Sequence, residues 1–316
     1  MKKISLLLVL CLVLAGCTPA PKQYNATYLN LFDTVTTVIG YGENQSQEIY
    51  EQLYRYHQLF DIYHDYDGIH NLKTVNDQAG IAPVAVDSAI IDLLLDCKTY
   101  YELTDGKVNA AMGSVLRLWH EVREKGKLPD ADALAKARAH MDFENVIIDK
   151  IASTVYISDP EMSLDVGAIA KGWAVQRVAE NAPKGMLISV GGNVCATGEK
   201  ADGSAWVVGV QNPDGGEYLR KISITGGAVV TSGDYQRTVT IDGKAYHHII
   251  DPETGMPSTY WRSVTVVCDD SGLADALSTA LFVLPLEEGK ALAEQCRAKV
   301  LWLDGEGKQY TTEDFW

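Results

Sequence analysis

The succession of helix-like and strand-like segments constrains the fold of this chain more than any other feature of its sequence. Ile49, Leu53, Tyr56, Phe60 and Tyr63 recur at three- and four-residue steps, which predicts an amphipathic helix with Tyr63 on its apolar face. Strands and helices follow one another without regular alternation, which favours an α+β fold over a doubly wound parallel sheet. Helices are predicted over residues 49–63, 86–104, 131–140, 170–182, 273–283 and 287–296, and strands over 35–40, 146–148, 155–157, 186–190, 206–210, 222–224, 263–268 and 300–303.

The N-terminus has the pattern of a secretory signal. Lys2 and Lys3 precede an apolar run that is too short to span a membrane, and small residues lead to Cys17. A cysteine directly after Ala-Gly is the acylated position of bacterial lipoproteins, although an ordinary signal peptide with an incidental cysteine would share most of the pattern. Residues 1–16 are therefore expected to be a lipoprotein signal peptide, 17–27 a tether and 28–316 the folded domain. The protein is then expected to be exported and anchored to the cell membrane, on its periplasmic or extracellular face, through lipidated Cys17.

Charge and cysteine content exclude several classes of protein. Without Lys2 and Lys3 the formal charge changes from −15 to −17, whereas nucleic-acid binders are basic along one face. No polybasic patch would attract lipid headgroups, so membrane attachment would rest on Cys17. The remaining cysteines are scattered without metal-type spacing, and no Pro/Gly/Ser-rich linker divides the chain. A single domain that does not bind nucleic acid is expected.

The segment 164–173, Leu-Asp-Val-Gly-Ala-Ile-Ala-Lys-Gly-Trp, places a carboxylate, a turn of small residues and a lysine where a helix begins. Glycines let a backbone approach a ligand closely, and a helix start offers free N–H groups to phosphate oxygens. The order Lys-Gly-Trp is not that of a Walker A loop. As a bare pattern, the segment is more typical of a plain β-to-α turn.

The segment 273–281 carries a second pattern. On a helix, Leu273, Leu277 and Leu281 form a core stripe, while Asp275 and Thr279 share another face. A carboxylate and a hydroxyl presented together suit a hard cation such as magnesium. The alternative is a solvated aspartate beside a threonine that bonds back to its own helix.

The segment 246–255 ends in Asp-Pro-Glu-Thr-Gly, which is a turn signal. His247 and His248 are adjacent at the end of a predicted strand, so only one of them can face a given cleft. A histidine in a cleft can serve as a general base near neutral pH. Glycine-bearing turns also occur at 191–193 and 231–235.

Taken together and in this order, these motifs resemble the ApbE family of FAD:protein FMN transferases. The resemblance runs from about Tyr28 to about Pro285 and is carried by residues 164–172, 191–193, 231–235, 248–255 and 273–281. It implies a single ApbE-like, T-fold-related α+β domain with mixed sheets and flanking helices. Family members are often signal-bearing lipoproteins, in agreement with Cys17.

The resemblance also implies the site residues. Magnesium would be held by Asp275 and Thr279, with Ser278 as a further contact and a carbonyl from Ala168. FAD would be bound by Asp165 and Lys171. The residues expected on the flavin side are Phe32, Tyr63, Asn109, Ala110, Ala111, His248 and Ile249.

The implied reaction is phosphoryl transfer to a protein. The hydroxyl of a target threonine or serine attacks the FMN-side phosphorus of FAD, and AMP leaves. Magnesium and Lys171 would neutralise charge on the phosphates, and His248 is the expected acceptor of the hydroxyl proton. The implied acceptors are exported flavoproteins, such as subunits of Rnf complexes and of sodium-pumping NADH:quinone reductases.

Two segments depart from the family pattern, both on the expected flavin side. Phe32-Asp33-Thr34 stands where Met-Gly-Thr is frequent, and residues 108–114 replace a Phe-Asp-Ile-Thr-Val-Gly-Pro segment. Two other functions remain open. One is a magnesium-dependent FAD pyrophosphatase that uses water as the nucleophile, and the other is a lipoprotein that only binds flavin. A pure binder needs no metal at the pyrophosphate, so Asp275 and Thr279 argue against it.

Overall fold

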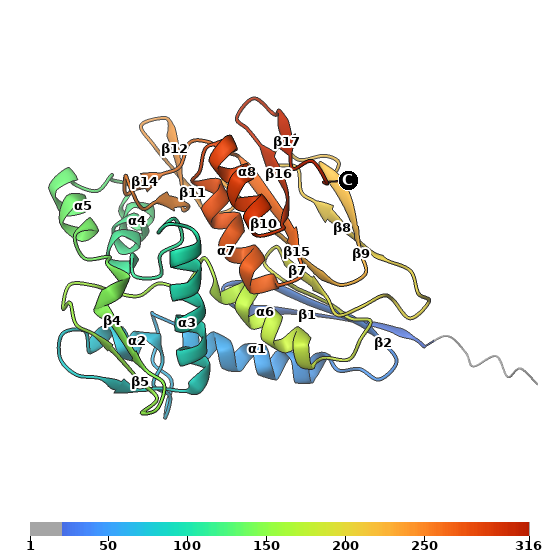
Figure 1. Cartoon of the computed structure of the whole chain (residues 1–316), viewed down its shortest axis with the longest axis horizontal. Coiled ribbons are helices and arrows are strands. Elements are labelled where there is room, and N and C mark those ends of the chain that lie inside the picture. The colour runs from blue at the N-terminus through green and yellow to red at the C-terminus, as the bar shows by residue number, and fades with distance from the viewer. Residues whose placement is uncertain (1–20, 316) are drawn as a thin grey trace, which may run out of the picture.

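An eight-stranded antiparallel sheet forms the centre of the computed structural model, which describes residues 21–315 (Figure 1). Neighbouring strands hydrogen-bond in the order β1-β2-β6-β7-β10-β15-β16-β17. The two ends of the described chain therefore form opposite edges of one sheet. The strands are β1 (Gln23–Leu31), β2 (Thr34–Tyr41), β6 (Leu187–Val190), β7 (Asn193–Ala196), β10 (Gly227–Gly233), β15 (Ser263–Cys268), β16 (Lys299–Leu303) and β17 (Gln309–Thr311).

Helices cover one face of this sheet and a hairpin covers the other. The covering helices are α1 (Ser46–Phe60), α6 (Ala170–Asn181), α7 (Ser271–Phe282) and α8 (Leu286–Gln295), and in Figure 1 α6 and α7 lie next to each other in front of the strands. The hairpin of β8 (Trp206–Val210) and β9 (Arg220–Ile224) buries Trp206, Val208 and Ile222 against Val229, Val267 and Leu301 of the sheet. Alternation of buried and exposed residues along β8 is the pattern of a strand with one covered face.

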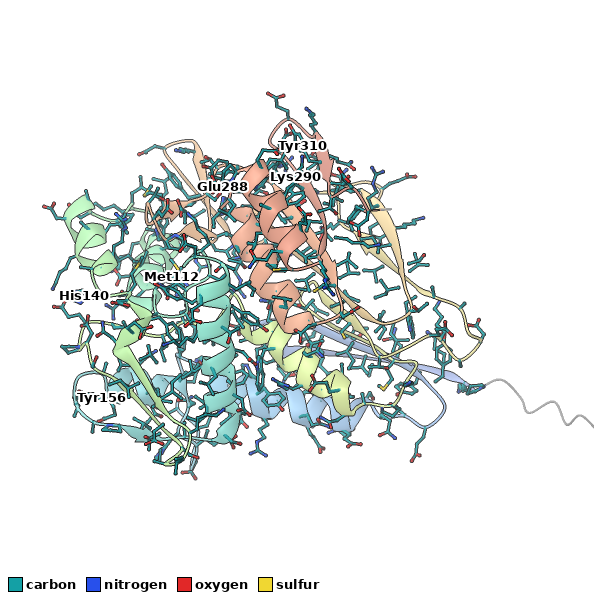
Figure 2. The ribbon with its side chains drawn as sticks, viewed as in Figure 1. Met112, His140, Tyr156, Glu288, Lys290 and Tyr310 are labelled. Carbon is teal, nitrogen blue, oxygen red and sulfur yellow. The ribbon has the colours of Figure 1, made fainter. Side chains whose placement is uncertain are left out.

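The second half of the fold extends from the edge of this helical layer. It contains α2 (Leu72–Asp77), α3 (Ser88–Leu103), α4 (Gly113–Lys125), α5 (Ala131–Arg138), a short 3₁₀ turn (Phe143–Asn145) and a small sheet of β3 (Val84–Ala85), β4 (Val146–Asp149) and β5 (Thr154–Ile157). Met112 and His140 lie in this part of the molecule, whereas Glu288 and Lys290 lie on α8 (Figure 2).

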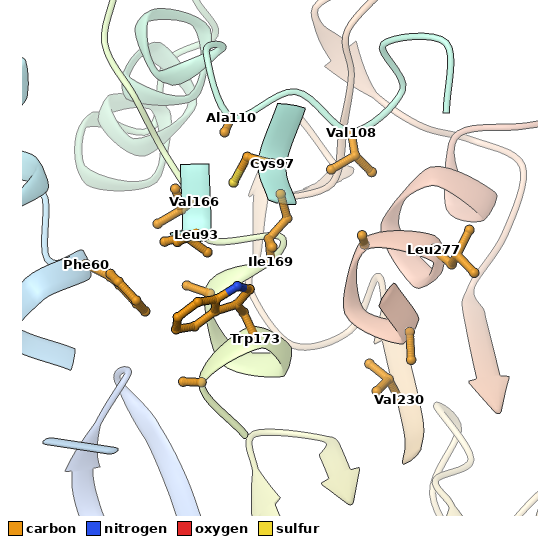
Figure 3. Packing of buried hydrophobic residues seen from close by; sticks show 14 of the residues in the cluster. Phe60, Leu93, Cys97, Val108, Ala110, Val166, Ile169, Trp173, Val230 and Leu277 are labelled. Carbon is orange, nitrogen blue, oxygen red and sulfur yellow. The ribbon is translucent and has the colours of Figure 1, made fainter. Parts of the chain in front are cut away.

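A shared core joins the two halves into one unit. Figure 3 shows Val166 and Ile169, which precede α6, and Trp173 in its first turn, packed beside Leu93 and Cys97 of α3. A smaller cluster joins α4 and α5 to the hairpin of β11 (Thr238–Ile241) and β12 (Lys244–His247) and to the pair β13 (Ile250–Asp251) and β14 (Met256–Pro257). The predicted α+β class is confirmed. In residues 21–315 no helix is both long and apolar enough to cross a bilayer.

Most of the predicted elements are present in the structure, but several elements and boundaries differ. The strand 263–268 is β15, and the predicted helices 170–182 and 273–283 are α6 and α7 to within two residues. Helix α4 was not predicted. The expected tether overlaps the fold, because residues 23–27 pair with β2 as part of β1. The first helix ends at Phe60 rather than at residue 63. The signal peptide and Cys17 lie outside the described residues.

Candidate active site

Helices α6 and α7 approach each other closely at Gly172. The Gly172 N–H, in the first turn of α6, donates to Asp275 Oδ2 on α7 at 2.9 Å. A Cβ at position 172 would lie 2.3 Å from the Ser271 carbonyl oxygen and 2.5 Å from Asp275 Cβ. Only glycine therefore lets the two helices approach this closely, and the buried carboxylate of Asp275 caps the N-terminus of α6.

Asp275 is buried and paired with a lysine. The residue is 3% exposed, so the alternative of a solvated aspartate is wrong. Lys171 Nζ lies 3.4 Å from Asp275 Oδ2 and donates to the Gly167 carbonyl oxygen at 3.0 Å. Lys171 of the 164–173 segment thus contacts the carboxylate of Asp275 from the 273–281 segment. The contact lies at the N-terminus of α6, which favours anions.

The expected metal ligands divide into two groups. Thr279 lies one turn after Asp275 and is partly exposed, and the Gly172 N–H bonds to Asp275 rather than to the Ala168 carbonyl four residues earlier. Ser278 is fully buried, and its hydroxyl donates to the Asp275 carbonyl at 2.9 Å and contacts Ser232 Oγ at 2.8 Å. Ser278 therefore ties α7 to β10, whereas Asp275 and the Ala168 carbonyl lie at the start of α6 and Thr279 lies one turn after Asp275 on α7.

These oxygen donors fit magnesium that is shared with a phosphate ligand. Residues 21–315 contain no group of three or more His, Cys, Asp or Glu side chains that would hold a metal ion. Magnesium is commonly bound by one or two carboxylates together with substrate phosphates rather than by an all-protein cage. One carboxylate, one hydroxyl and one carbonyl beside a helix N-terminus match that arrangement.

Backbone hydrogen bonds bring residues 109–111 beside the Asp165 turn. The Asp165 N–H donates to the Ala110 carbonyl at 2.8 Å, and Asp165 Oδ1 accepts from the Gly167 N–H at 2.9 Å. Asn109 is 7% exposed, and its amide bonds to the Met141 carbonyl and to the Ala111 N–H. The side chain of Asn109 therefore shapes this segment from within.

Tyr63 lies in the loop after α1, so its assignment to the apolar face of that helix is wrong. The side chain is 54% exposed, and its hydroxyl lies 2.8 Å from His120 Nδ1 on α4. Partial burial and the charge of Asp165 raise the pKa of Tyr63 to about 12, although Arg123 and Arg237 act in the opposite direction. The tyrosine therefore stays protonated at neutral pH.

Phe32 lies between β1 and β2 and contacts His57 of α1. Its backbone has a positive φ of 51°, and its N–H donates to His57 Nδ1 at 3.2 Å. The Phe32 ring meets the His57 ring edge-on at 5.7 Å and packs against the main core. Such a backbone conformation is uncommon outside glycine, which indicates that the surrounding contacts fix it.

The two adjacent histidines have different environments. His247 Nε2 contacts the Ser258 carbonyl at 2.7 Å, and its Nδ1 accepts from the N–H of Ile249, which is 5% exposed. His248 Nδ1 is buried without a hydrogen-bond partner in the described part of the chain. The pKa of His248 is lowered to about 3, mainly by burial and next by the positive charge of Arg237. His248 is therefore a neutral imidazole whose Nδ1 has no hydrogen-bond partner in the described residues. Both ring nitrogens of His247, in contrast, have partners.

Three residues near the candidate site were not predicted from the sequence. The charges of Arg123 on α4 and Arg237 before β11 act on the pKa values of Tyr63 and His248, and His120 on α4 contacts the Tyr63 hydroxyl. His120, Arg123 and His248 line one small cavity of about 20 Å³. The spacing of Val115, Trp119 and Val122, all buried, would have predicted α4. Arg237 lies in a turn and carries no such signal.

Known proteins share both the sequence pattern and the fold. The model of the ApbE family matches residues 32–302. An FAD:protein FMN transferase of Treponema pallidum (strain Nichols) is 37% identical over 244 residues, which cover 71% of this chain and 67% of that protein. One from Klebsiella pneumoniae (strain 342) is 32% identical over 262 residues, which cover 81% and 80%.

Solved structures agree. The ApbE protein of Thermotoga maritima has a TM-score of 0.84 and 29% identity, with 93% of this chain and 98% of that chain covered. The flavin transferase ApbE from Vibrio cholerae has a TM-score of 0.79 and 26% identity over the same shares. The chain belongs to the ApbE family.

Proposed function

We propose that this enzyme transfers FMN from FAD to a threonine or serine hydroxyl of another protein and releases AMP. The observation that carries the proposal is the buried Asp275 carboxylate, which accepts the Gly172 N–H and faces Lys171, both in the first turn of α6. A carboxylate, an ammonium group and the positive end of a helix dipole at one point suit a pyrophosphate with its counter-ion. The relatives named FAD:protein FMN transferase support this substrate.

The pyrophosphate of FAD is proposed to lie at the start of α6. Asp275, Thr279 and the Ala168 carbonyl would hold magnesium, and Lys171 would contact a phosphate oxygen. Magnesium, when bound, supplies positive charge to the phosphate oxygens. The positive end of the α6 dipole lies at the same place, so it favours the same anion.

His248 is proposed to accept the proton of the attacking hydroxyl. The imidazole is neutral because burial and cationic neighbours lower its pKa, and only a neutral imidazole can accept a proton. The negative phosphates would offset the charges of Arg237 and Lys171 and so raise that pKa when FAD is bound. The hydroxyl oxygen forms a bond to the FMN-side phosphorus, the bond from that phosphorus to the AMP oxygen breaks, and AMP departs.

The acceptors are proposed to be exported flavoproteins, such as subunits of Rnf complexes or of sodium-pumping NADH:quinone reductases. The test incubates the enzyme with FAD, magnesium and one such subunit, and measures the intact mass of the subunit. A gain of one FMN supports the proposal. Free FMN and AMP beside an unmodified acceptor would identify a pyrophosphatase, and intact FAD would identify a flavin-binding protein.

We further propose that lipidated Cys17 holds the enzyme at the exported face of the membrane. The proposal rests on the sequence around Cys17, which has the lipoprotein pattern. Cys17→Ala is expected to leave the membrane fraction for the soluble exported fraction, or to remain unprocessed. A variant that is still processed normally and still pellets with membranes would refute lipid anchoring.

A further inference from the structure

One hydrogen bond connects the loop after α1 to α4 across 57 residues of sequence. The Tyr63 hydroxyl lies 2.8 Å from His120 Nδ1, and the two rings are 5.8 Å apart. Tyr63 is expected beside FAD, whereas His120 belongs to no motif that predicted the site. The role of His120 therefore follows from the fold and not from any sequence pattern.

The backbone of the Tyr63 loop is held independently of this bond. Asp61 Oδ1 accepts from the N–H groups of Tyr63 at 2.7 Å and of His64 at 3.2 Å, and Asp61 Oδ2 accepts from the Tyr66 hydroxyl at 2.8 Å. These bonds fix the backbone of Tyr63 but not the orientation of its ring. Within residues 21–315, the Tyr63 hydroxyl hydrogen-bonds to His120 Nδ1.

The surroundings of His120 place it between Tyr63 and the proposed proton acceptor. His120 lines the same small cavity as His248 and Arg123, which lies one turn later on α4. Trp119, its neighbour, is 4% exposed and donates to the Gly255 carbonyl at 2.8 Å, so this turn of α4 is firmly attached to the 248–255 segment. His120 is therefore mounted on a rigid support.

We propose that His120 is a positioning residue that fixes the Tyr63 ring in its FAD-binding orientation before FAD arrives. This inference rests on the proposed function, because it takes FAD to bind beside Tyr63. A ring that is more than half exposed would otherwise lose rotational freedom when it contacts the ligand. A hydrogen bond to a fixed helix removes that freedom in advance, so FAD binds more tightly.

The test is a double-mutant cycle read out as the dissociation constant for FAD, measured by flavin fluorescence with magnesium present. His120→Leu removes the hydrogen-bonding nitrogen, and Tyr63→Phe removes the hydroxyl but keeps the ring. Each single change is expected to weaken FAD binding about threefold to tenfold, the cost of immobilising one side chain. In the Tyr63→Phe background, His120→Leu should have little further effect, because the bond is already absent.

Two matched variants separate positioning from general damage. His120→Asn keeps a polar group near the place of Nδ1 and should recover most of the affinity. Arg117→Leu lies on the exposed face of α4 and should bind FAD as the native enzyme does. If His120→Leu fails to fold, Tyr63→Phe alone must reproduce the loss of affinity.

Equal losses from His120→Leu in the native and Tyr63→Phe backgrounds would overturn the positioning role. So would unchanged affinity in a folded His120→Leu or Tyr63→Phe protein. A native enzyme that binds no FAD would instead refute the proposed function, so the two failures are distinguishable.

Discussion

At the scale of single residues, Asp275 combines a structural and a chemical task. Its carboxylate accepts the Gly172 N–H and faces Lys171, so replacement by alanine leaves a buried N–H group without an acceptor. That loss costs about 1–3 kcal/mol of folding free energy. Activity lost in Asp275→Ala would therefore not distinguish the loss of a metal ligand from the loss of stability.

Asp275→Asn separates the two tasks. The asparagine side-chain oxygen can still accept the Gly172 N–H, but the charge that magnesium requires is gone. We expect the variant to keep a melting temperature close to that of the native protein and to lose magnesium-dependent FAD turnover. Thermal unfolding and AMP release, measured on the same preparation, check both. Full turnover by the folded variant would show that Asp275 does not hold the metal.

Lys171 occupies the place where a cation would approach Asp275. Free magnesium must compete with the ammonium group, so Lys171→Gln is expected to bind magnesium at least about threefold more tightly without FAD. Calorimetric titration with magnesium alone measures this. Lys290→Gln, whose lysine pairs with Glu287 on α8, is the matched control and should not change the affinity. Weaker magnesium binding by Lys171→Gln would show that the lysine does not compete.

The residues of the candidate site that lie within a single motif could be predicted from the sequence together with the family resemblance. Asp275 and Thr279 are one turn apart on α7, and Lys171 and Gly172 lie at the start of α6. His120 and Arg237 come from a helix and a turn that only the tertiary fold brings near Tyr63. No periodicity within one segment can carry that information.

At the scale of elements, the contact between α6 and α7 determines the geometry of the site. Gly172→Ala would place a methyl group 2.3 Å from the Ser271 carbonyl and force the helices apart. Overpacking of this kind costs about 1–3 kcal/mol, and the displaced Asp275 should also lose its function. Chemical denaturation and FAD turnover are the measurements. Gly305→Ala, where a Cβ meets nothing within 4 Å, should be neutral, and a neutral Gly172→Ala would contradict the close contact.

Element boundaries show why hydrophobic periodicity misplaced Tyr63. The spacing from Ile49 to Phe60 is helical, and a tyrosine at position 63 continues it. Asp61 stops the helix, because its carboxylate accepts the N–H groups of Tyr63 and His64. Aspartate competes in this way with helical hydrogen bonding, and the competition is invisible to a count of apolar positions.

At the scale of the whole molecule, the buried neutral imidazoles make stability depend on pH. The pKa of His248 is about 3 in the folded protein, below its ordinary value of 6.5, because burial disfavours the charged form. Below about pH 6.5, His248 therefore binds a proton in the unfolded chain but stays unprotonated in the folded protein. The free energy of unfolding should fall by up to about 1.4 kcal/mol per pH unit as the pH drops from 6 toward 4.

His248→Asn should remove this part of the pH dependence. Urea denaturation at about pH 7 and about pH 4.5 compares the two proteins, and the native protein should lose more stability between these values. The pKa values of His57, His120 and His247 are also lowered by burial, but these residues are present in both proteins and cancel in the difference. Parallel losses in the two proteins would place His248 in contact with water.

The enzyme is proposed to transfer FMN to a protein hydroxyl rather than to hydrolyse FAD with water. The most direct measurement compares the AMP released with the FMN bound covalently to an exported flavoprotein acceptor, at one magnesium concentration. We expect one AMP for each FMN on the acceptor, little free FMN, and no reaction after the magnesium is chelated. AMP released together with an equal amount of free FMN, beside a competent acceptor, would contradict this expectation.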